Sequence, residues 1–134
     1  MDNILVDTSV WINYSKGIAN IQTDRLDEYL KFHPNHLWCC PPILQEFLMG
    51  LKTKQDFEFY LLHLGRFMIP NLDWPKLSIS AAKLYFDLKK KGITIRKSND
   101  CLIAQIAIAN DCLLVHNDSD FELIASGSSL KVLN

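Results

Sequence analysis

Short apolar runs typical of β-strands alternate with helical patterns from one end of the sequence to the other. The first run, Ile4-Leu5-Val6, leads directly into Asp7-Thr8-Ser9, which are residue types that begin helices. Neither an internal repeat nor a low-complexity linker interrupts this order. Alternation of this kind predicts an α/β fold, with a parallel sheet covered by helices on both faces and ligands bound outside the carboxyl ends of its strands.

The predicted sheet has about five strands. They are expected at residues 4–6, 36–40, 67–69, 112–115 and 130–132, the last at an edge of the sheet. Helices are expected at residues 10–14, 23–33, 43–49, 55–64, 74–91 and 98–109, and a further one begins at residue 118. Ser98 is expected to cap the helix that it begins, and Gly92 to end the long helix before it.

Length and charge narrow the class of protein. The 134 residues, 49% of them hydrophobic, suit one compact domain over residues 1–134. The sequence lacks the pattern of a signal peptide and any apolar stretch near the roughly 20 residues that span a bilayer, so we expect a cytoplasmic protein without membrane contact. A net charge of −1 argues against nucleic-acid binding through bulk positive charge. Any such contact must be local, and Lys89-Lys90-Lys91 and Arg96-Lys97 are the candidate basic clusters.

Four cysteines lie in apolar surroundings without a CxxC pair, at Cys39, Cys40, Cys101 and Cys112. We expect them to be small buried side chains without a disulfide framework. His33 and His36 stand close to Cys39 and Cys40, so these four residues offer nitrogen and sulfur ligands to zinc as an alternative. Residues 36–40 also resemble a strand, in which alternate side chains point to opposite faces, and this disfavours the zinc site.

Acidic residues fall where strands end and helices begin. Asp7 follows the first predicted strand, and Asp118 and Asp120 follow the fourth. Glu46 lies one turn into the helix after the second strand, and Asp100 lies in the first turn of its helix. Each could serve only as a helix cap or a solvated side chain. However, strand ends and helix starts meet at one edge of a doubly wound sheet, and this joint placement favours a shared site.

Carboxylates gathered in this way need a cation. Two unit charges about 4 Å apart repel by ~1 kcal/mol in water and ~4 kcal/mol at an effective dielectric constant of 20. Oxygen ligands suit Mg²⁺ or Mn²⁺ rather than zinc, and Mg²⁺ keeps several waters, which leaves room for a phosphate oxygen. The acidic site therefore predicts metal-assisted hydrolysis of a phosphodiester.

With these residues placed, the chain resembles the PIN-domain nucleases, and among them the VapC toxins of bacterial toxin–antitoxin pairs. The matching segments span nearly the whole chain: Ile4-Leu5-Val6-Asp7-Thr8-Ser9-Val10-Trp11-Ile12, Glu46-Phe47-Leu48-Met49-Gly50, Asn99-Asp100-Cys101-Leu102-Ile103-Ala104 and Asn117-Asp118-Ser119-Asp120-Phe121. The opening segment alone is weakly specific, whereas all four in this order and at this length are strong. One departure is His116-Asn117, where relatives often have Thr followed by Arg or Asn.

The resemblance implies a three-layer α/β/α fold and Mg²⁺-dependent endoribonuclease activity on RNA, tRNA included. It also implies a homodimer and inhibition by a cognate VapB-type antitoxin. Carried over residue by residue, Asp7 and Asp100 are expected to be the principal metal ligands, with Asp118 as the first choice for a third. Glu46 is expected to complete the acidic site and orient the attacking water. Asp120 is expected to begin the last helix and assist.

Two other functions stay open from the sequence. A magnesium-dependent phosphatase for small molecules would use Asp7 as nucleophile, although Thr8-Ser9 follows without a second aspartate to act as a general acid. A catalytically inactive PIN-like module would only bind RNA or a protein, although every acidic position is filled.

Six aromatic residues either line an antitoxin groove or fill the core. They are Trp11, Tyr14, Phe57, Phe59, Tyr60 and Phe67.

Overall fold

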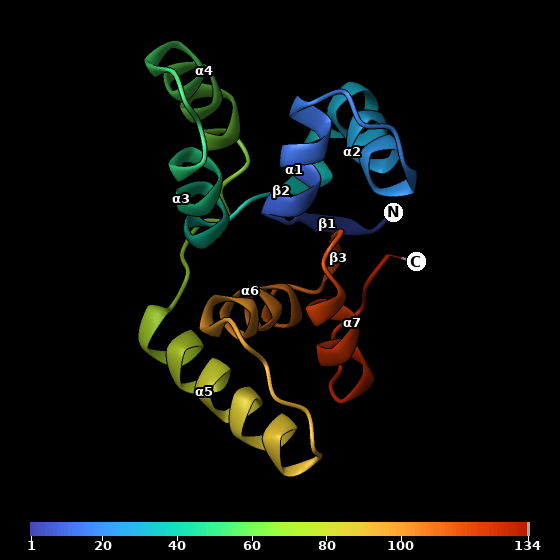
Figure 1. Cartoon of the computed structure of the whole chain (residues 1–134), viewed down its shortest axis with the longest axis vertical. Helices are drawn as coiled ribbons and strands as arrows, with labels where there is room; N and C mark the ends of the chain where they lie inside the picture. The colour runs from blue at the N-terminus through green and yellow to red at the C-terminus, as the bar shows by residue number, and fades with distance from the viewer. Residues whose placement is uncertain (134) are drawn as a thin grey trace.

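A parallel sheet in the order β2–β1–β3 lies at the centre of the computed structural model, which describes residues 1–133 (Figure 1). The central strand β1 (Asn3–Val6) pairs with β2 (Leu37–Trp38) on one side and with β3 (Cys112–Val115) on the other. Both pairings are parallel, so the three carboxyl ends meet at one edge. The predicted parallel sheet is confirmed, and with it the edge where the acids were expected.

The outer two predicted strands are present as single parallel bridges. Cys39 bridges to Met68 beyond β2, and Leu114 bridges to Val132 beyond β3. The backbone of Cys39 also exchanges hydrogen bonds with the backbones of Phe67 and Ile69. The strand expected at an edge, residues 130–132, does lie at one, and residues 67–69 lie at the other. Each extends the sheet only by a single bridge, because neither segment stays extended long enough to build a ladder.

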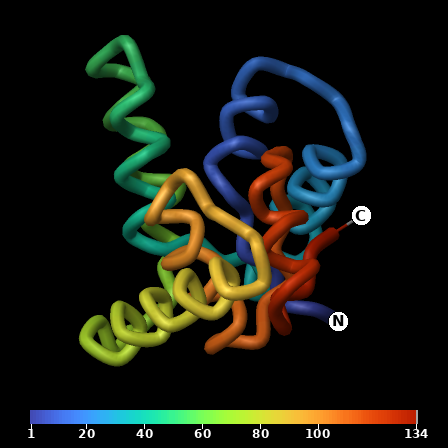
Figure 2. The backbone as a smooth tube through the Cα atoms, turned by 60° about the horizontal axis from the view of Figure 1, so that its bottom comes forward, coloured from blue at the N-terminus to red at the C-terminus, as the bar shows by residue number. Residues whose placement is uncertain are grey.

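Seven α-helices and one short 3₁₀ helix surround the sheet in the described part of the chain. They are α1 (Thr8–Ser15), α2 (Ile21–Phe32), η1 (Pro34–His36), α3 (Pro41–Met49), α4 (Lys54–Gly65), α5 (Trp74–Lys90), α6 (Ser98–Ala109) and α7 (Ser119–Ser126). Figure 1 shows α1 and α2 on one face of the sheet, with α5, α6 and α7 on the other. The expected three layers are therefore present. One end of the α3–α4 hairpin projects beyond the other helices (Figures 1 and 2), while α3 packs against α1 and α6 and buries Ile43 and Phe47 in the core. The two termini lie near each other (Figure 1).

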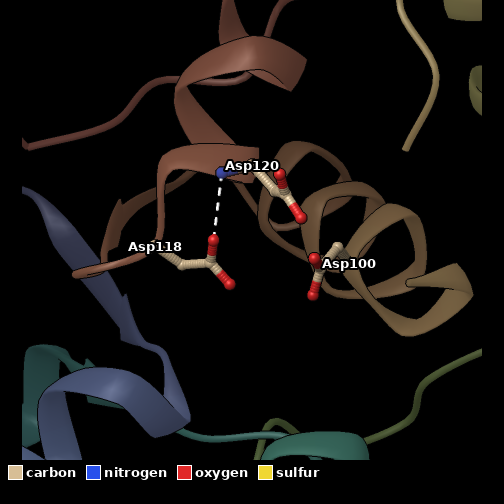
Figure 3. Close-up of side chains that lie close together, drawn as sticks. All are labelled: Asp100, Asp118 and Asp120. Atoms are coloured by element: carbon tan, nitrogen blue, oxygen red, sulfur yellow. Dashed lines mark hydrogen bonds between the residues drawn. The ribbon is translucent and has the colours of Figure 1, made fainter. Parts of the chain in front are cut away.

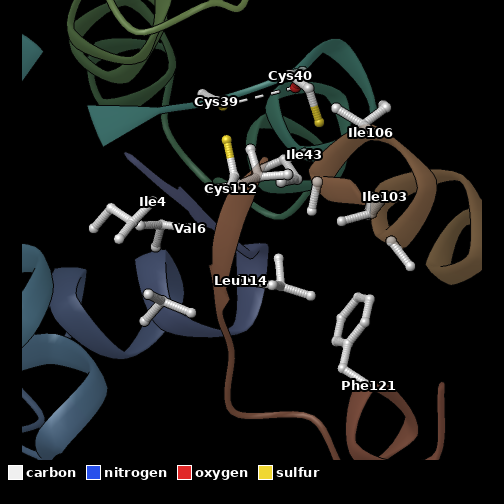
Figure 4. Close-up of a cluster of buried hydrophobic side chains, with 14 of the residues drawn as sticks. Ile4, Val6, Cys39, Cys40, Ile43, Ile103, Ile106, Cys112, Leu114 and Phe121 are labelled. Carbon is white, nitrogen blue, oxygen red and sulfur yellow. Dashed lines mark hydrogen bonds between the residues drawn. The ribbon is translucent and has the colours of Figure 1, made fainter. Parts of the chain in front are cut away.

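Buried side chains from the strands pack against those of the covering helices and form one hydrophobic core (Figure 4). Ile4 and Val6 of β1, and Leu114 of β3, are fully buried. Beneath the sheet, Ile103 of α6 and Phe121 of α7 close the core, also without exposed surface. This packing fixes where α6 and α7 begin relative to the strand ends.

Most helices begin as their sequences indicate. Asp7, Thr53, Asp73 and Asp118 cap α1, α4, α5 and α7, each by accepting a hydrogen bond from a backbone N–H. The prediction for Ser98 is wrong. Lys97 holds the extended N-cap position of α6 without a side-chain cap, and Ser98 is already the first helical residue. The helix begins one residue early because burial of its apolar residues, rather than a cap, sets its position.

Leu114→Ala should lower the free energy of unfolding by about 2–5 kcal/mol, because Leu114 is fully buried and its truncation leaves a cavity in the core. Urea unfolding followed by circular dichroism measures this change. Leu123→Ala on α7 is the matched control, since Leu123 is 45% exposed and its truncation should cost less than about 1 kcal/mol. Equal losses for the two variants would contradict this description of the core.

Candidate metal-binding site

Three aspartates converge at the carboxyl edge of the sheet (Figure 3). Asp100 comes from the first turn of α6, while Asp118 and Asp120 lie at the start of α7. One carboxylate oxygen from each lies within 4.8 Å of the others. Asp100 and Asp120 are each only 4% exposed. Carboxylates this close repel each other, and the repulsion is offset when one keeps its proton or when a cation compensates their charge.

Asp118 and Asp120 have different local roles. Asp118 is the N-cap of α7, and its Oδ1 accepts the backbone N–H of Asp120 at 3.0 Å. Its side chain is 21% exposed, and its Oδ2 lies 3.4 Å from Lys97 Nζ. Asp120 is a first-turn residue whose Oδ2 is buried without a hydrogen-bond partner. The structure therefore brings both acids to the site and gives the capping role to Asp118.

Asp7 lies at the end of β1, also at this edge, but it is not among the three closest carboxylates. It is buried, and its Oδ2 accepts the backbone N–H of Ser9 at 3.1 Å and the Ser9 hydroxyl at 2.7 Å. Asp7 is thus the N-cap of α1, and at the same time its charge adds to burial and to the charge of Asp118 in raising the pKa of Asp100. Its expected role as a metal ligand stays a prediction.

Glu46 lies in α3, on a helix that leaves the sheet edge after β2, and its side chain is exposed. Partial burial and then the charge of Asp7 raise the pKa of the Glu46 carboxyl above its ordinary value. Glu46 therefore shares the field of the acidic site but stands at its solvent side. A carboxylate in such a place can accept a proton more readily than one in bulk water.

The electrostatics of the site disfavour negative charge. Burial, followed by the charge of Asp118, raises the pKa of Asp100 to about 7. Burial also raises the pKa of Asp7, against the hydrogen bonds from Ser9. In return, the charges of Asp118 and Asp100 raise the pKa of Lys97. The cluster of Asp7, Glu46, Asp100, Asp118 and Asp120 is called the acidic site below.

Two basic side chains from the segment before α6 partly compensate this charge. Arg96 Nη2 lies 3.5 Å from Asp120 Oδ1, and Lys97 Nζ lies 3.4 Å from Asp118 Oδ2. Both side chains are mostly exposed, so each ion pair is weak. Arg96 and Lys97 are the local basic cluster that the sequence indicated, and the structure places them beside the acids.

The residues present fit a hard divalent cation. Asp100 Oδ2 and Asp120 Oδ2 are buried with no hydrogen-bond partner in the described structure, which is a costly state for carboxylate oxygens. A cation bound between them would satisfy both atoms and offset the mutual repulsion. The donor set is all oxygen, which suits Mg²⁺ or Mn²⁺.

The residues of the alternative zinc site are not arranged to bind a metal ion. Cys39 and Cys40 are fully buried, and burial raises the pKa of the Cys39 thiol to about 12, which disfavours the thiolate that zinc requires. Cys39 Sγ instead donates to the carbonyl of Cys40, and His36 Nδ1 lies 2.9 Å from Asn3 Oδ1. All four cysteines are free and buried, as expected of small core side chains.

His116 is a buried positioning residue at the end of β3. Its Nδ1 accepts the backbone N–H of Asp118 at 3.1 Å, so its Nε2 carries the proton in the neutral ring. Nε2 lies 3.2 Å from Glu122 Oε1, and the ring packs on Phe121. In the sequence this histidine stood out only as a departure from related sequences. The structure shows that it holds the backbone from which Asp118 projects.

A further group of contacts was missed from the sequence. The side chains of Asn13, Asn20 and Asn117 meet beside the acidic site, and Asn117 N–H donates to Ser9 Oγ. No motif or periodicity links these three positions. Only the folded arrangement of α1, α2 and the loop after β3 brings them together.

Asp100→Asn should stabilise the metal-free protein at pH 8. The Asp100 carboxyl has a folded-state pKa of about 7, above its unfolded value near 3.8, so its contribution to stability falls as pH rises through this window. We expect Tm to rise by about 3–5 °C at pH 8, roughly 1 kcal/mol, and to change little near pH 4. Mg²⁺ should stabilise the wild type more than the variant. Thermal unfolding with and without EDTA measures both effects, with exposed Asp111→Asn as control. A lower Tm at pH 8 would contradict the charge repulsion.

Replacing His116 tests its contact with Asp118. His116→Asn keeps an acceptor near the place of Nδ1, whereas His116→Gln moves the polar group toward Nε2. We expect Mn²⁺ affinity to fall roughly tenfold in His116→Gln and much less in His116→Asn. Isothermal titration calorimetry measures the affinity at a temperature where both variants are folded. Equal losses in the two variants would show that the ring acts only through packing.

Known proteins resemble this chain over nearly its whole length. The sequence profile of the PIN domain family matches residues 4–127. The chain is 30% identical over 128 residues to a VapC ribonuclease of Mycobacterium bovis and to ribonuclease VapC11 of Mycobacterium tuberculosis, with 96% of each chain covered in both cases. The matched segment includes every residue of the acidic site.

Solved structures share the fold. A VapBC2 structure from Rickettsia felis bound to a DNA fragment from its promoter includes a chain with a TM-score of 0.74 and 23% identity, covering 98% of this chain and 97% of that one. VapBC-1 from nontypeable Haemophilus influenzae gives a TM-score of 0.71 at 19% identity, covering 98% and 96%. FitAcB from Neisseria gonorrhoeae gives 0.69 at 20% identity, covering 98% and 96%. The three-layer architecture with its central parallel sheet is the one these proteins have.

Proposed function

Because the chain belongs to the PIN-domain family, we propose that it is a Mg²⁺-dependent endoribonuclease that serves as the toxin of a VapBC-type pair. One observation carries the proposal: Asp100, Asp118 and Asp120 converge at the ligand edge of the sheet, and two of their buried oxygens have no partner among the described residues. The 30% identity to ribonucleases over almost the whole chain supports RNA as the substrate class.

Asp100 and Asp118, with Asp120 beside them and Asp7 at the end of β1, would hold the metal. When bound, Mg²⁺ neutralises the charge that develops on the phosphate and lowers the pKa of water. Lys97 and Arg96 lie on the solvent side of these acids and attract the phosphate backbone of RNA. Asp7 stays oriented because Ser9 donates two hydrogen bonds to one of its oxygens.

Glu46 is the proposed proton acceptor, since it is exposed at the edge of the site and the pKa of its carboxyl is raised. Water attacks the phosphorus atom in line with the bond to the 3′ oxygen, and that bond breaks. One proton of the water passes to Glu46, and the 3′ oxygen takes a proton from solvent. The products are a 3′ hydroxyl and a 5′ phosphate.

The antitoxin is proposed to dock in an apolar groove of about 580 Å³ between α1, α2 and α4. Five of the six aromatic residues singled out in the sequence line it: Trp11, Tyr14, Phe59, Tyr60 and Phe67. Phe57, the sixth, is exposed elsewhere on α4. Aromatic side chains in an open groove supply the large contact areas on which protein interfaces depend.

A second copy of the chain is proposed to cover the outer face of α5. Ile79 and Phe86 lie about two turns apart on this helix and are 71% and 57% exposed. Large apolar side chains so exposed on one helical face are typical of an interface between subunits.

None of the described helices is long and apolar enough to cross a membrane.

Purified protein should cleave RNA with Mg²⁺, and EDTA should abolish the cleavage. Asp7→Asn and Asp100→Asn should each slow it roughly 100-fold or more, because the metal loses a ligand or its charge compensation. Asp111→Asn, an exposed acid remote from the site, is the control that keeps wild-type activity. Gel analysis of labelled RNA measures the rates.

The same preparations separate the two other functions. Release of phosphate from small phosphorylated molecules, with a trapped aspartyl phosphate on Asp7, would identify a phosphatase instead. RNA binding without cleavage in any divalent metal would identify an inactive binding module. Either result would overturn the proposed ribonuclease.

A further inference from the structure

Three asparagine side chains from separate parts of the chain meet on one amide oxygen. Asn117 Oδ1, in the loop after β3, accepts Asn13 Nδ2 of α1 at 3.0 Å and Asn20 Nδ2, at the N-cap of α2, at 3.4 Å. These three residues are called the asparagine cluster. Asn13 and Asn20 are half-buried, and Asn117 is exposed. The cluster is therefore ordered by its own contacts while it still faces solvent.

The cluster is joined directly to the acidic site. Asn117 precedes Asp118, and its backbone N–H donates to Ser9 Oγ at 2.9 Å. Ser9 Oγ in turn donates to Asp7 Oδ2 at 2.7 Å. Two hydrogen bonds thus connect the backbone of the asparagine cluster to one of the acids. Any molecule that reaches the acidic site from this side passes the cluster.

The cluster offers donors and few acceptors. Asn117 Oδ1 is already occupied twice, and Asn20 Oδ1 accepts the backbone N–H of Thr23. Each amide nitrogen has two hydrogens. Asn13 and Asn20 use one each, and Asn117 Nδ2 has no acceptor in the described part of the chain. Four N–H groups are therefore free, against the unoccupied amide oxygen of Asn13, so the cluster favours a ligand that mainly accepts hydrogen bonds.

Stability alone does not explain the cluster. Exposed hydrogen bonds exchange with water and contribute little net free energy to folding. In addition, α1 and α2 are already linked by Tyr14 Oη, which donates to Asp27 at 2.8 Å. The cluster lies where Asp7 and Asp118 repel anions, and neutral donors attract phosphate oxygens without drawing the carboxylates away from a metal.

We propose that the asparagine cluster binds a phosphate group of single-stranded RNA that neighbours the cleaved phosphate, through amide N–H groups of Asn117 and Asn13. This proposal rests on the proposed RNA cleavage, for which it names a second point of substrate contact. Phosphate fits better than a base edge, because its oxygens only accept and the cluster mainly donates. With Lys97 and Arg96 at the acids themselves, the contact fixes the direction in which the RNA crosses the site.

The test measures RNA binding separately from cleavage. A short fluorescein-labelled single-stranded RNA is titrated with protein in Ca²⁺, and anisotropy gives Kd for the wild type, Asn117→Ala and Asn13→Ala. Gln55→Ala, which removes an exposed amide from α4, is the matched control. The same RNA is also prepared with a single neutral methylphosphonate at each position in turn. Thermal unfolding and Mn²⁺ titration of every variant report its fold and its acidic site.

We expect Asn117→Ala to raise Kd roughly tenfold, which corresponds to about 1.4 kcal/mol, and Asn13→Ala to raise it less. Mn²⁺ affinity and the salt dependence of binding should stay unchanged, because the lost contact is neutral. A methylphosphonate at one position should weaken wild-type binding but add no further loss in Asn117→Ala.

Three results would overturn the proposal: no RNA binding by the wild type, a Kd within twofold of wild type in Asn117→Ala, or additive effects of the variant and every methylphosphonate. Wild-type protein that binds RNA with these dependences but does not cleave it in Mg²⁺ would support this contact and refute the proposed ribonuclease. The two failures are therefore distinguishable.

Discussion

Mutual repulsion between buried carboxylates is the constraint on which the site depends. Asp100 and Asp120 lie almost out of contact with solvent beside Asp118, and burial raises the pKa of Asp100 to about 7. The parallel sheet can hold them there because the carboxyl ends of its strands and the starts of α6 and α7 meet at one edge. Packing of Ile103 and Phe121 in the core fixes these two helices and makes the arrangement possible.

The hydrogen bonds and ion pairs around the acidic site have different roles. Ser9 orients Asp7, and His116 holds the backbone of Asp118. Asp118 itself caps α7 while its side chain faces Asp100 and Asp120. Arg96 and Lys97 offset part of the charge from the solvent side. The same atoms therefore begin helices and shape the site, so a capping role and a functional role are compatible in Asp7 and Asp118.

Much of this could be read from the sequence, because strand and helix patterns are local. The three main strands, the order of the helices and the edge that carries the acids all follow from apolar runs and helix-start residues. The prediction for Ser98 was wrong because Ser98 is a good capping residue by type, whereas α6 already begins at Ser98 and Lys97 holds the N-cap position. The outer strands were placed correctly but proved to be single bridges, since ladder length depends on neighbouring segments.

Side-chain geometry was beyond the sequence. The distinction between Asp118 and Asp120 depends on which oxygen caps α7 and which is left buried without a partner. Likewise, Asn13, Asn20 and Asn117 are spread over most of the chain and meet only after α1 and α2 pack beside the loop that follows β3. Such contacts between distant residues have no local signature in the sequence.

Anomalous diffraction from crystals grown with Mn²⁺ tests the central claim most directly, since manganese replaces Mg²⁺ at oxygen sites and its position can be located without assumptions about activity. The convergence of Asp100, Asp118 and Asp120 predicts a strong anomalous peak between their carboxylates, with Asp100 and Asp120 ligating through the oxygens that now lack partners. A peak elsewhere on the chain, or none at this edge of the sheet at saturating Mn²⁺, would contradict it.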